Sequence, residues 1–150
     1  MLAAEPRQAD ALHMLGVLAH QVGRNDVAAE LIGQAIAVAP GVADFHSNLG
    51  EVHRAAARPE EAIAAYRRAI ALDPNIPEAH NNLGIALRSQ GRAEEAIAAY
   101  RAAIALQPGY AQAHSNIGNA LKDAGRLDDS ALAAKMARVR EILRATGRAE

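Results

Sequence analysis

The chain repeats one pattern every 34 residues, and this period constrains its fold more than any other feature. A glycine preceded by an aliphatic residue occurs four times at that spacing, in Leu15-Gly16, Leu49-Gly50, Leu83-Gly84 and Ile117-Gly118. A proline closes three of the units at one common offset, at Pro40, Pro74 and Pro108. A fixed 34-residue period is typical of a solenoid in which every unit is a pair of helices.

Each unit contains two predicted helices, and the units cover residues 9–42, 43–76, 77–110 and 111–127. We expect first helices over 9–22, 43–56, 77–90 and 111–123, second helices over 26–39, 60–73 and 94–107, and a long terminal helix over 128–146. Glycine just past a helix end supplies a left-handed C-cap residue, and Gly23, Gly91 and Gly125 fit that role. The second unit has Ala57-Arg58-Pro59 there, so we expect its turn to close differently.

The packed face of each unit follows from helical periodicity. With each unit numbered from 1 to 34, positions 4, 7, 8 and 11 share one face of the first helix. Glycine at position 8 lets a neighbouring helix approach closely, and we expect the alanine at position 20 to meet it, at Ala28, Ala62 and Ala96. We expect the terminal helix to cap the last repeat with its apolar residues Met136, Val139, Ile142 and Leu143.

The N-terminus predicts an uncovered surface. Pro6 lies 34 residues before Pro40, so residues 1–8 are interpreted as the remnant of a preceding repeat. No helix then covers the outer side of 9–22. The preferred interpretation is a piece of a longer array; the alternative is an exposed helix that docks a partner or a second copy of the chain.

The pattern resembles the tetratricopeptide repeat family over nearly the whole chain. The matching features are the aliphatic-glycine pair at positions 7–8, alanine at 20 and 27, Tyr66 and Tyr100 at 24, and proline at 32. Position 4 departs from the family pattern, because it holds Leu12, His46, His80 and His114 where a large aromatic is usual. The resemblance implies an all-α, right-handed superhelical solenoid, a single domain over 1–150, that works as a protein-interaction scaffold.

In this family the first helices line a concave groove, which would present positions 2, 6, 9 and 13. Asparagine occupies position 6 three times in register, and its amide is both donor and acceptor, the complement of a peptide backbone. We therefore expect an extended peptide or partner segment in the groove. The alternative is that the asparagines cap neighbouring backbone or each other, or are inherited from a duplicated sequence. The predicted peptide-binding residues are Asn48, Asn82, Asn116, Asp44, Glu78, Gln112, Asn119, Arg54, Arg88 and Lys122.

The asparagine ladder and the stretch 113–122 are also similar to the repeats of O-linked N-acetylglucosamine transferases and their bacterial relatives. That resemblance implies a second function, substrate recognition for a larger glycosyltransferase. A third possible function is a self-assembling scaffold built through 9–22. The family's carboxylate clamp for chaperone tails is not expected, because Asp44, Glu51 and Glu78 stand where cations are needed.

The composition argues against several other classes of function. The net charge is −1 and the arginines are scattered, so neither nucleic acid nor membrane is an expected partner. The chain has no cysteine, which fits a cytoplasmic location. The recurring histidines lie one per repeat, too far apart to share a metal ion. No nucleophile elbow or phosphate-binding loop is present, so we expect no enzyme activity, no cofactor and no metal.

Overall fold

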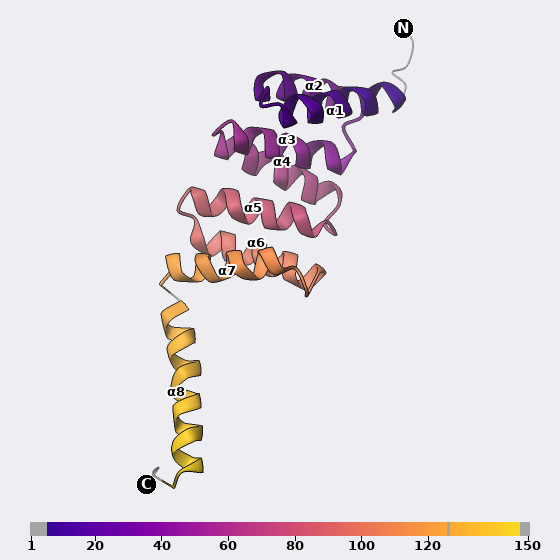
Figure 1. Cartoon of the computed structure of the whole chain (residues 1–150). Helices are drawn as coiled ribbons and strands as arrows, with labels where there is room; N and C mark the ends of the chain where they lie inside the picture. Colours follow the sequence, from indigo (N-terminus) through magenta and orange to yellow (C-terminus); the bar gives the residue numbers. More distant parts are fainter. Residues whose placement is uncertain (1–5, 126, 148–150) are drawn as a thin grey trace.

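The computed structural model describes residues 6–125 and 127–147, and within them the chain is all α-helical (Figure 1). The predicted all-α repeat fold is confirmed. Eight helices are described: α1 (Pro6–Gln21), α2 (Asn25–Val38), α3 (Ala43–Ala55), α4 (Pro59–Leu72), α5 (Pro77–Ser89), α6 (Ala93–Leu106), α7 (Ala111–Asp123) and α8 (Leu127–Ala145). None of these helices is long and apolar enough to cross a membrane.

The helices start and end within a few residues of the predicted ranges, except at the N-terminus. There α1 begins at Pro6, three residues before the predicted start at Ala9, so residues 6–8 continue the first helix. The rest of the predicted remnant, residues 1–5, lies outside the described residues.

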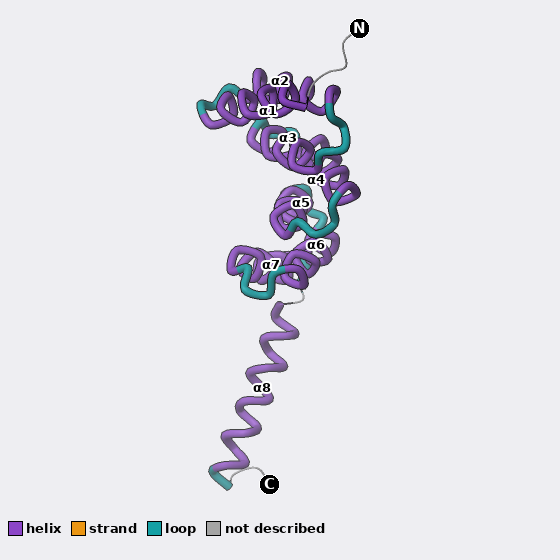
Figure 2. Tube along the Cα trace, turned by 90° about the vertical axis from the view of Figure 1, so that its right-hand side faces the viewer, coloured by secondary structure: helices purple, strands orange, loops and turns teal. Residues whose placement is uncertain are grey.

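The helices pack as a row of pairs. α1 packs on α2, α3 on α4 and α5 on α6, and each pair also contacts the first helix of the next pair. The odd-numbered helices α1, α3, α5 and α7 additionally contact one another in sequence, whereas α2, α4 and α6 do not. The odd-numbered helices therefore lie closer together and form the inner face of the curved row (Figure 2).

The repeated glycine is a contact point inside the first three pairs, where the residue at position 24 lies against it. A Cβ atom on Gly50 would lie 2.6 Å from the ring of Tyr66, and one on Gly84 would lie 2.5 Å from the ring of Tyr100. Both rings are fully buried. The residue at position 24 therefore packs most closely on the glycine. In the first pair, a Cβ atom on Gly16 would meet Ile32 at that position and also the predicted partner Ala28, whose carbonyl oxygen would lie 3.3 Å away.

The turn of the second repeat closes like the other turns, contrary to the expectation from sequence. Ala57 adopts the left-handed conformation, with φ 58°, that Gly91 adopts in the next repeat with φ 72°. The amide of Arg58 donates to the carbonyl of His53 at 2.8 Å, as the amide of Arg92 donates to that of Leu87 at 3.0 Å. The repeat therefore imposes the turn geometry even where the sequence lacks glycine.

Replacement of Ala57 with glycine is expected to stabilise the fold. A residue with a Cβ atom is destabilised by about 1–2 kcal/mol in the left-handed region, and glycine relieves this strain. The greater flexibility of glycine in the unfolded chain offsets part of that stabilisation. We expect a net increase of about 0.5–1 kcal/mol in the free energy of unfolding, measured by urea titration. Gly91→Ala is the reverse control and should destabilise the protein; an unchanged or lower stability of Ala57→Gly would contradict the prediction.

The terminal helix does not cap the solenoid in the predicted way. α8 contacts only α7 among the described helices and extends away from the stack (Figures 1 and 2). Its apolar residues Met136, Val139, Ile142 and Leu143 are 37–54% exposed. Position 24 of the fourth unit is Ala134 in the sequence, so no large ring is available to fill the recess beside Gly118. A Cβ atom on Gly118 would meet nothing within 4 Å among the described atoms.

The three histidines at position 4 have a structural role. The Nε2 atoms of His46, His80 and His114 donate to the carbonyl oxygens of Pro40, Pro74 and Pro108, at 2.9, 2.8 and 2.7 Å. Each bond spans the loop between one repeat and the next. A histidine takes the place of the expected large aromatic residue because its ring nitrogen ties down a loop carbonyl.

Candidate functional site

The ten predicted peptide-binding residues all lie on the odd-numbered helices α3, α5 and α7, on or beside the inner face. Asn48, Asn82 and Asn116 are half-buried, as is Arg88. The remaining residues are exposed: Asp44, Glu78, Gln112, Asn119, Arg54 and Lys122. The asparagines therefore occupy the floor of this face, and most of the charged residues surround them.

The three asparagines use their amide groups inside the chain. The Nδ2 atom of Asn48 donates to Nε2 of His13 at 2.7 Å. That of Asn82 donates to Oε1 of Glu51 at 2.6 Å, and that of Asn116 to Oδ1 of Asn81 at 3.0 Å. Each bond joins one repeat to the next. The partners are side chains of the preceding repeat, rather than backbone or one another as the alternative had it, and each takes up one N–H of an asparagine amide.

Glu51 is the centre of a polar cluster between the second and third repeats. Its Oε1 atom accepts hydrogen bonds from the Tyr66 hydroxyl at 3.2 Å and from Asn82 at 2.6 Å. Its Oε2 atom accepts a hydrogen bond from Nη2 of Arg54 at 3.0 Å. Burial raises the pKa of the Tyr66 hydroxyl, and the charge of Glu51 raises it further. The hydroxyl therefore remains a neutral donor to the carboxylate.

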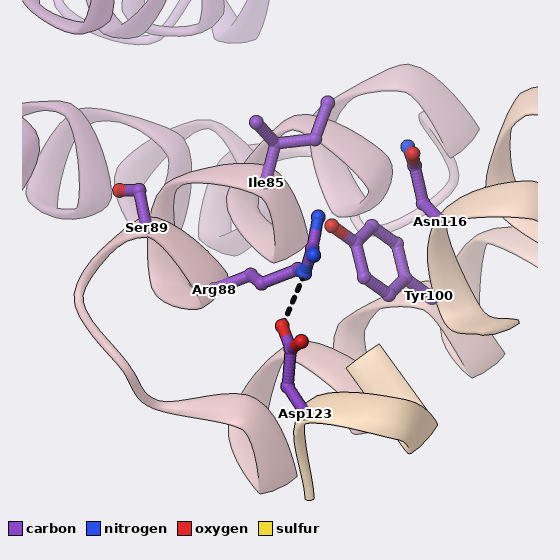
Figure 3. A pocket seen from close by; sticks show the side chains of 6 residues that line it. All are labelled: Ile85, Arg88, Ser89, Tyr100, Asn116 and Asp123. Atoms are coloured by element: carbon purple, nitrogen blue, oxygen red, sulfur yellow. Dashed lines mark hydrogen bonds and ion pairs between the residues drawn. The ribbon is translucent and has the colours of Figure 1, made fainter. Parts of the chain in front are cut away.

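The same cluster recurs one repeat later without its central carboxylate. Ile85 stands where the preceding repeat has Glu51, while Tyr100, Asn116 and Arg88 match Tyr66, Asn82 and Arg54 at the 34-residue spacing. Arg88 turns to the next repeat, where its Nε atom donates to Oδ2 of Asp123 at 2.5 Å. Ile85, Arg88, Tyr100, Asn116, Asp123 and Ser89 line an open hollow of about 420 Å³ (Figure 3).

Tyr100 points its hydroxyl into this hollow. Figure 3 shows the hydroxyl turned toward the guanidinium of Arg88. The hydroxyl makes no hydrogen bond to any residue of the described part of the chain, although Tyr100 itself is only 1% exposed. Burial raises its pKa to about 12, with Arg88 lowering and Asp123 raising it. Tyr100 therefore offers the hollow a neutral, unused donor.

Glu51, Ile85 and Asp123 stand at positions 9 and 13, which were expected to line the groove, but they were not among the predicted peptide-binding residues, and neither were the two tyrosine hydroxyls. The sequence did contain a signal. Positions 6, 12 and 24 stay Asn, Arg and Tyr across this pair of units, whereas position 9 changes from Glu51 to Ile85. Position 9 therefore varies between the two units, whereas the hydrogen-bond donors that surround it at positions 6, 12 and 24 do not.

Replacement of each tyrosine with phenylalanine should separate the two clusters. Tyr66→Phe removes a hydrogen bond to a charged acceptor, and we expect a loss of about 1–2 kcal/mol in the free energy of unfolding. Tyr100→Phe removes no such bond and is expected to change stability by less than about 0.5 kcal/mol. Urea unfolding of the two variants measures the difference. Equal losses would show that the Glu51 cluster does not distinguish the two repeats.

Burial lowers the pKa of two histidines, His13, which is bonded to Asn48, and His53, at the packed position 11 of the second unit. His13 accepts the Asn48 bond at Nε2, so this nitrogen carries no proton, and its ring stacks on Phe45 with 4.5 Å between centroids. Burial lowers the pKa of His13, although Asp44 and Asp10 oppose the shift. Burial also lowers the pKa of His53, where Glu61 opposes the shift and Arg58 adds to it.

Stability should consequently fall on mild acidification. Both histidines have a folded-state pKa below the ordinary value of 6.5, so the unfolded chain binds protons first. The stabilisation is complete above about pH 6.5 and is lost as the pH falls from there through the lowered pKa values. Thermal melts at pH 8, 7, 6 and 5 measure this loss. The double variant His13→Gln/His53→Gln should show a flatter profile over that range, and an identical profile would refute the assignment.

No metal centre is apparent on this face. Among the side chains that the structure describes, no three histidine or acidic groups gather closely enough to hold an ion.

One family model matches most of the chain. The profile described as "Tetratricopeptide repeat" matches residues 13–77, 52–111 and 81–142. The structure of MamA is 28% identical and superposes with a TM-score of 0.79, over 95% of this chain and 83% of MamA. No curated protein sequence gives a significant match.

Two further solved structures are domains of RPAP3 with bound peptides. The second tetratricopeptide domain of human RPAP3, in complex with the HSP70 peptide SGPTIEEVD, is 25% identical with a TM-score of 0.75, over 77% of this chain and 98% of that domain. The first domain, from Spaghetti (RPAP3) and bound to the HSP90 peptide SRMEEVD, is 18% identical with a TM-score of 0.80, over 83% and 99%. At that identity it shows a shared fold alone.

Proposed function

Because the chain belongs to the tetratricopeptide repeat family, we propose that it is a protein-interaction scaffold that binds an extended peptide along α3, α5 and α7. The observation that carries this proposal is the register of Asn48, Asn82 and Asn116 on the inner face. The human RPAP3 domain with its bound HSP70 peptide supports a peptide as the kind of ligand. The similarity to glycosyltransferase repeats stays a prediction.

The internal hydrogen bonds define how the ladder would work. Each Nδ2 atom is engaged within the chain, whereas the Oδ1 atoms of Asn48, Asn82 and Asn116 form no hydrogen bond to other described residues. An amide oxygen has two acceptor sites. The ladder would therefore accept backbone N–H groups from the ligand. Neighbouring helices pack about 8–10 Å apart, and three residues of extended chain span about 10 Å, so one asparagine would serve every third residue.

The test selects ligands from a library of random twelve-residue peptides and measures their affinity by fluorescence anisotropy. We expect the triple variant Asn48→Ala/Asn82→Ala/Asn116→Ala to bind selected peptides at least about tenfold more weakly. Circular dichroism shows whether its helices are retained. The matched control is Arg68→Ala/Arg101→Ala, which removes exposed side chains on α4 and α6 and should leave affinity unchanged. Equal affinities of the triple variant and the native chain would rule out the ladder.

Self-association is a second candidate, supported by the outer face of α1. Met14, Leu15, Leu18 and Val22 are 53–75% exposed and lie on or just after that helix. Exposed apolar residues grouped in this way mark surfaces that associate. Light scattering should give a mass above 15.7 kDa for the native chain at high concentration, and Leu15→Glu/Leu18→Glu should restore the monomer mass. A strictly monomeric native chain would exclude this candidate.

A further inference from the structure

The hollow between α5 and α7 has the donors of the Glu51 cluster but not the carboxylate that those donors surround. In the preceding repeat, Tyr66, Asn82 and Arg54 all donate to Glu51. In the hollow, the equivalent residues Tyr100, Asn116 and Arg88 remain, and Ile85 replaces the glutamate. The chain thus contains one filled copy of the arrangement and one unfilled copy.

The donors of the unfilled copy are only partly used. The Tyr100 hydroxyl has no partner among the described residues, and Tyr100 is almost completely buried, so the hydroxyl can reach a partner only through the hollow. Asn116 donates one N–H of its side-chain amide to Asn81, so the second N–H is available to a ligand. Arg88 donates its Nε–H to Asp123, and this is one of the five N–H donors that a guanidinium has. The hydroxyl opens onto the hollow, so an acceptor that enters the hollow can take this donor without any rearrangement of the chain.

We propose that this hollow binds the side-chain carboxylate of a glutamate in an extended peptide, in the position that Glu51 holds one repeat earlier. The proposal rests on the peptide-binding function above and gives that ligand a chemical feature. The Tyr100 hydroxyl, the remaining Asn116 N–H and Arg88 donate to the carboxylate, while Ile85 packs on the methylene groups. The hollow of about 420 Å³ has room for a side chain of this size.

Asp123 competes with the ligand for Arg88. The Arg88–Asp123 pair is exposed, at 38% and 41% of the two side chains, so water already weakens the attraction. A peptide carboxylate can take over the guanidinium, and Asp123 then moves toward solvent. Asp123 is therefore a residue that lowers the affinity for glutamate, and its neutralisation should raise that affinity.

The test uses capped pentapeptides that carry one central glutamate and no other charge, titrated into the ¹⁵N-labelled chain. We expect the signals of the Arg88 Nε–H and the Asn116 side-chain amide to shift. Asp123→Asn should bind about threefold or more tightly, since it removes the competitor. Ile85→Glu should bind about tenfold or more weakly, because it installs the carboxylate of the preceding repeat inside the hollow. Circular dichroism of Ile85→Glu shows whether it is folded, and Asp123→Asn gives an independent readout if it is not.

Two control peptides identify the group that is bound. The same pentapeptide with glutamine should shift these signals much less, and so should a glutamine pentapeptide with a free C-terminal carboxylate. Equal binding of the glutamine peptide, stronger binding of the free C-terminus, or an Asp123→Asn affinity no higher than that of the native chain would overturn the proposal. If selected peptides still bind through the asparagine ladder in that case, only the glutamate site is lost; if no peptide binds the inner face, the proposed function is lost with it.

Discussion

Replacement of Tyr100 with alanine should lower the free energy of unfolding by about 3–5 kcal/mol, the usual loss when a large buried ring is removed. The ring lies in the core cluster with Ala96, Ile97 and Leu87 and rests on the bare Cα of Gly84. Its loss would leave a cavity between α5 and α6 that rigid neighbouring helices cannot close. Urea unfolding followed by circular dichroism measures the effect.

The control for Tyr100→Ala is Tyr110→Ala, a tyrosine of the same size that is only half-buried in the loop before α7. It should cost clearly less, because less surface is removed from the core. A loss for Tyr100→Ala that is no larger than for Tyr110→Ala would contradict the packing described for position 24.

Replacement of Gly84 with alanine should destabilise the protein even though alanine is the better helix former. The added Cβ would lie 2.5 Å from the Tyr100 ring, and a buried ring cannot move aside freely. Overpacking of this kind costs about 1–3 kcal/mol, which exceeds the gain of about 1 kcal/mol in helix propensity. We expect a net loss of up to about 2 kcal/mol in the free energy of unfolding.

Two further variants test whether contact with the Tyr100 ring causes this loss of stability. Gly118→Ala occupies the same repeat position, but its Cβ would meet nothing within 4 Å among the described atoms, so it should stabilise α7 by up to about 1 kcal/mol. Gly84→Ala in a Tyr100→Ala background should cost nothing, because the ring that it strikes is gone. A loss of stability in Gly118→Ala, or strict additivity in the double variant, would refute the role assigned to the ring.

The helical repeat could be predicted from the sequence because it depends on periodicity alone. The 34-residue spacing and the prolines at position 32 located α2 to α7 within a few residues. The turn at Ala57 could not be predicted from local preference, since the packing of α3 on α4 outweighs the strain of one left-handed alanine.

The terminal helix and the polar clusters depend on which surfaces meet, and this is why they were predicted less well. The apolar residues of α8, such as Met136 and Ile142, follow a helical pattern, but that pattern does not specify the surface on which a helix packs. The asparagines at position 6 lie on the helices of the inner face, while the side chains that bond to them vary from His13 to Glu51 to Asn81. That variation is visible only once the repeats are stacked.

The bonds from His46, His80 and His114 to the proline carbonyls have a consequence for how the protein can bend. Each bond clamps one of the three loops at which successive pairs join, and these loops are the natural hinges of a solenoid. The same bond at each of these three loops restrains the angle between successive pairs. A ligand that contacts several repeats would then bind a preorganised surface, and little of its binding free energy would be lost in ordering the protein.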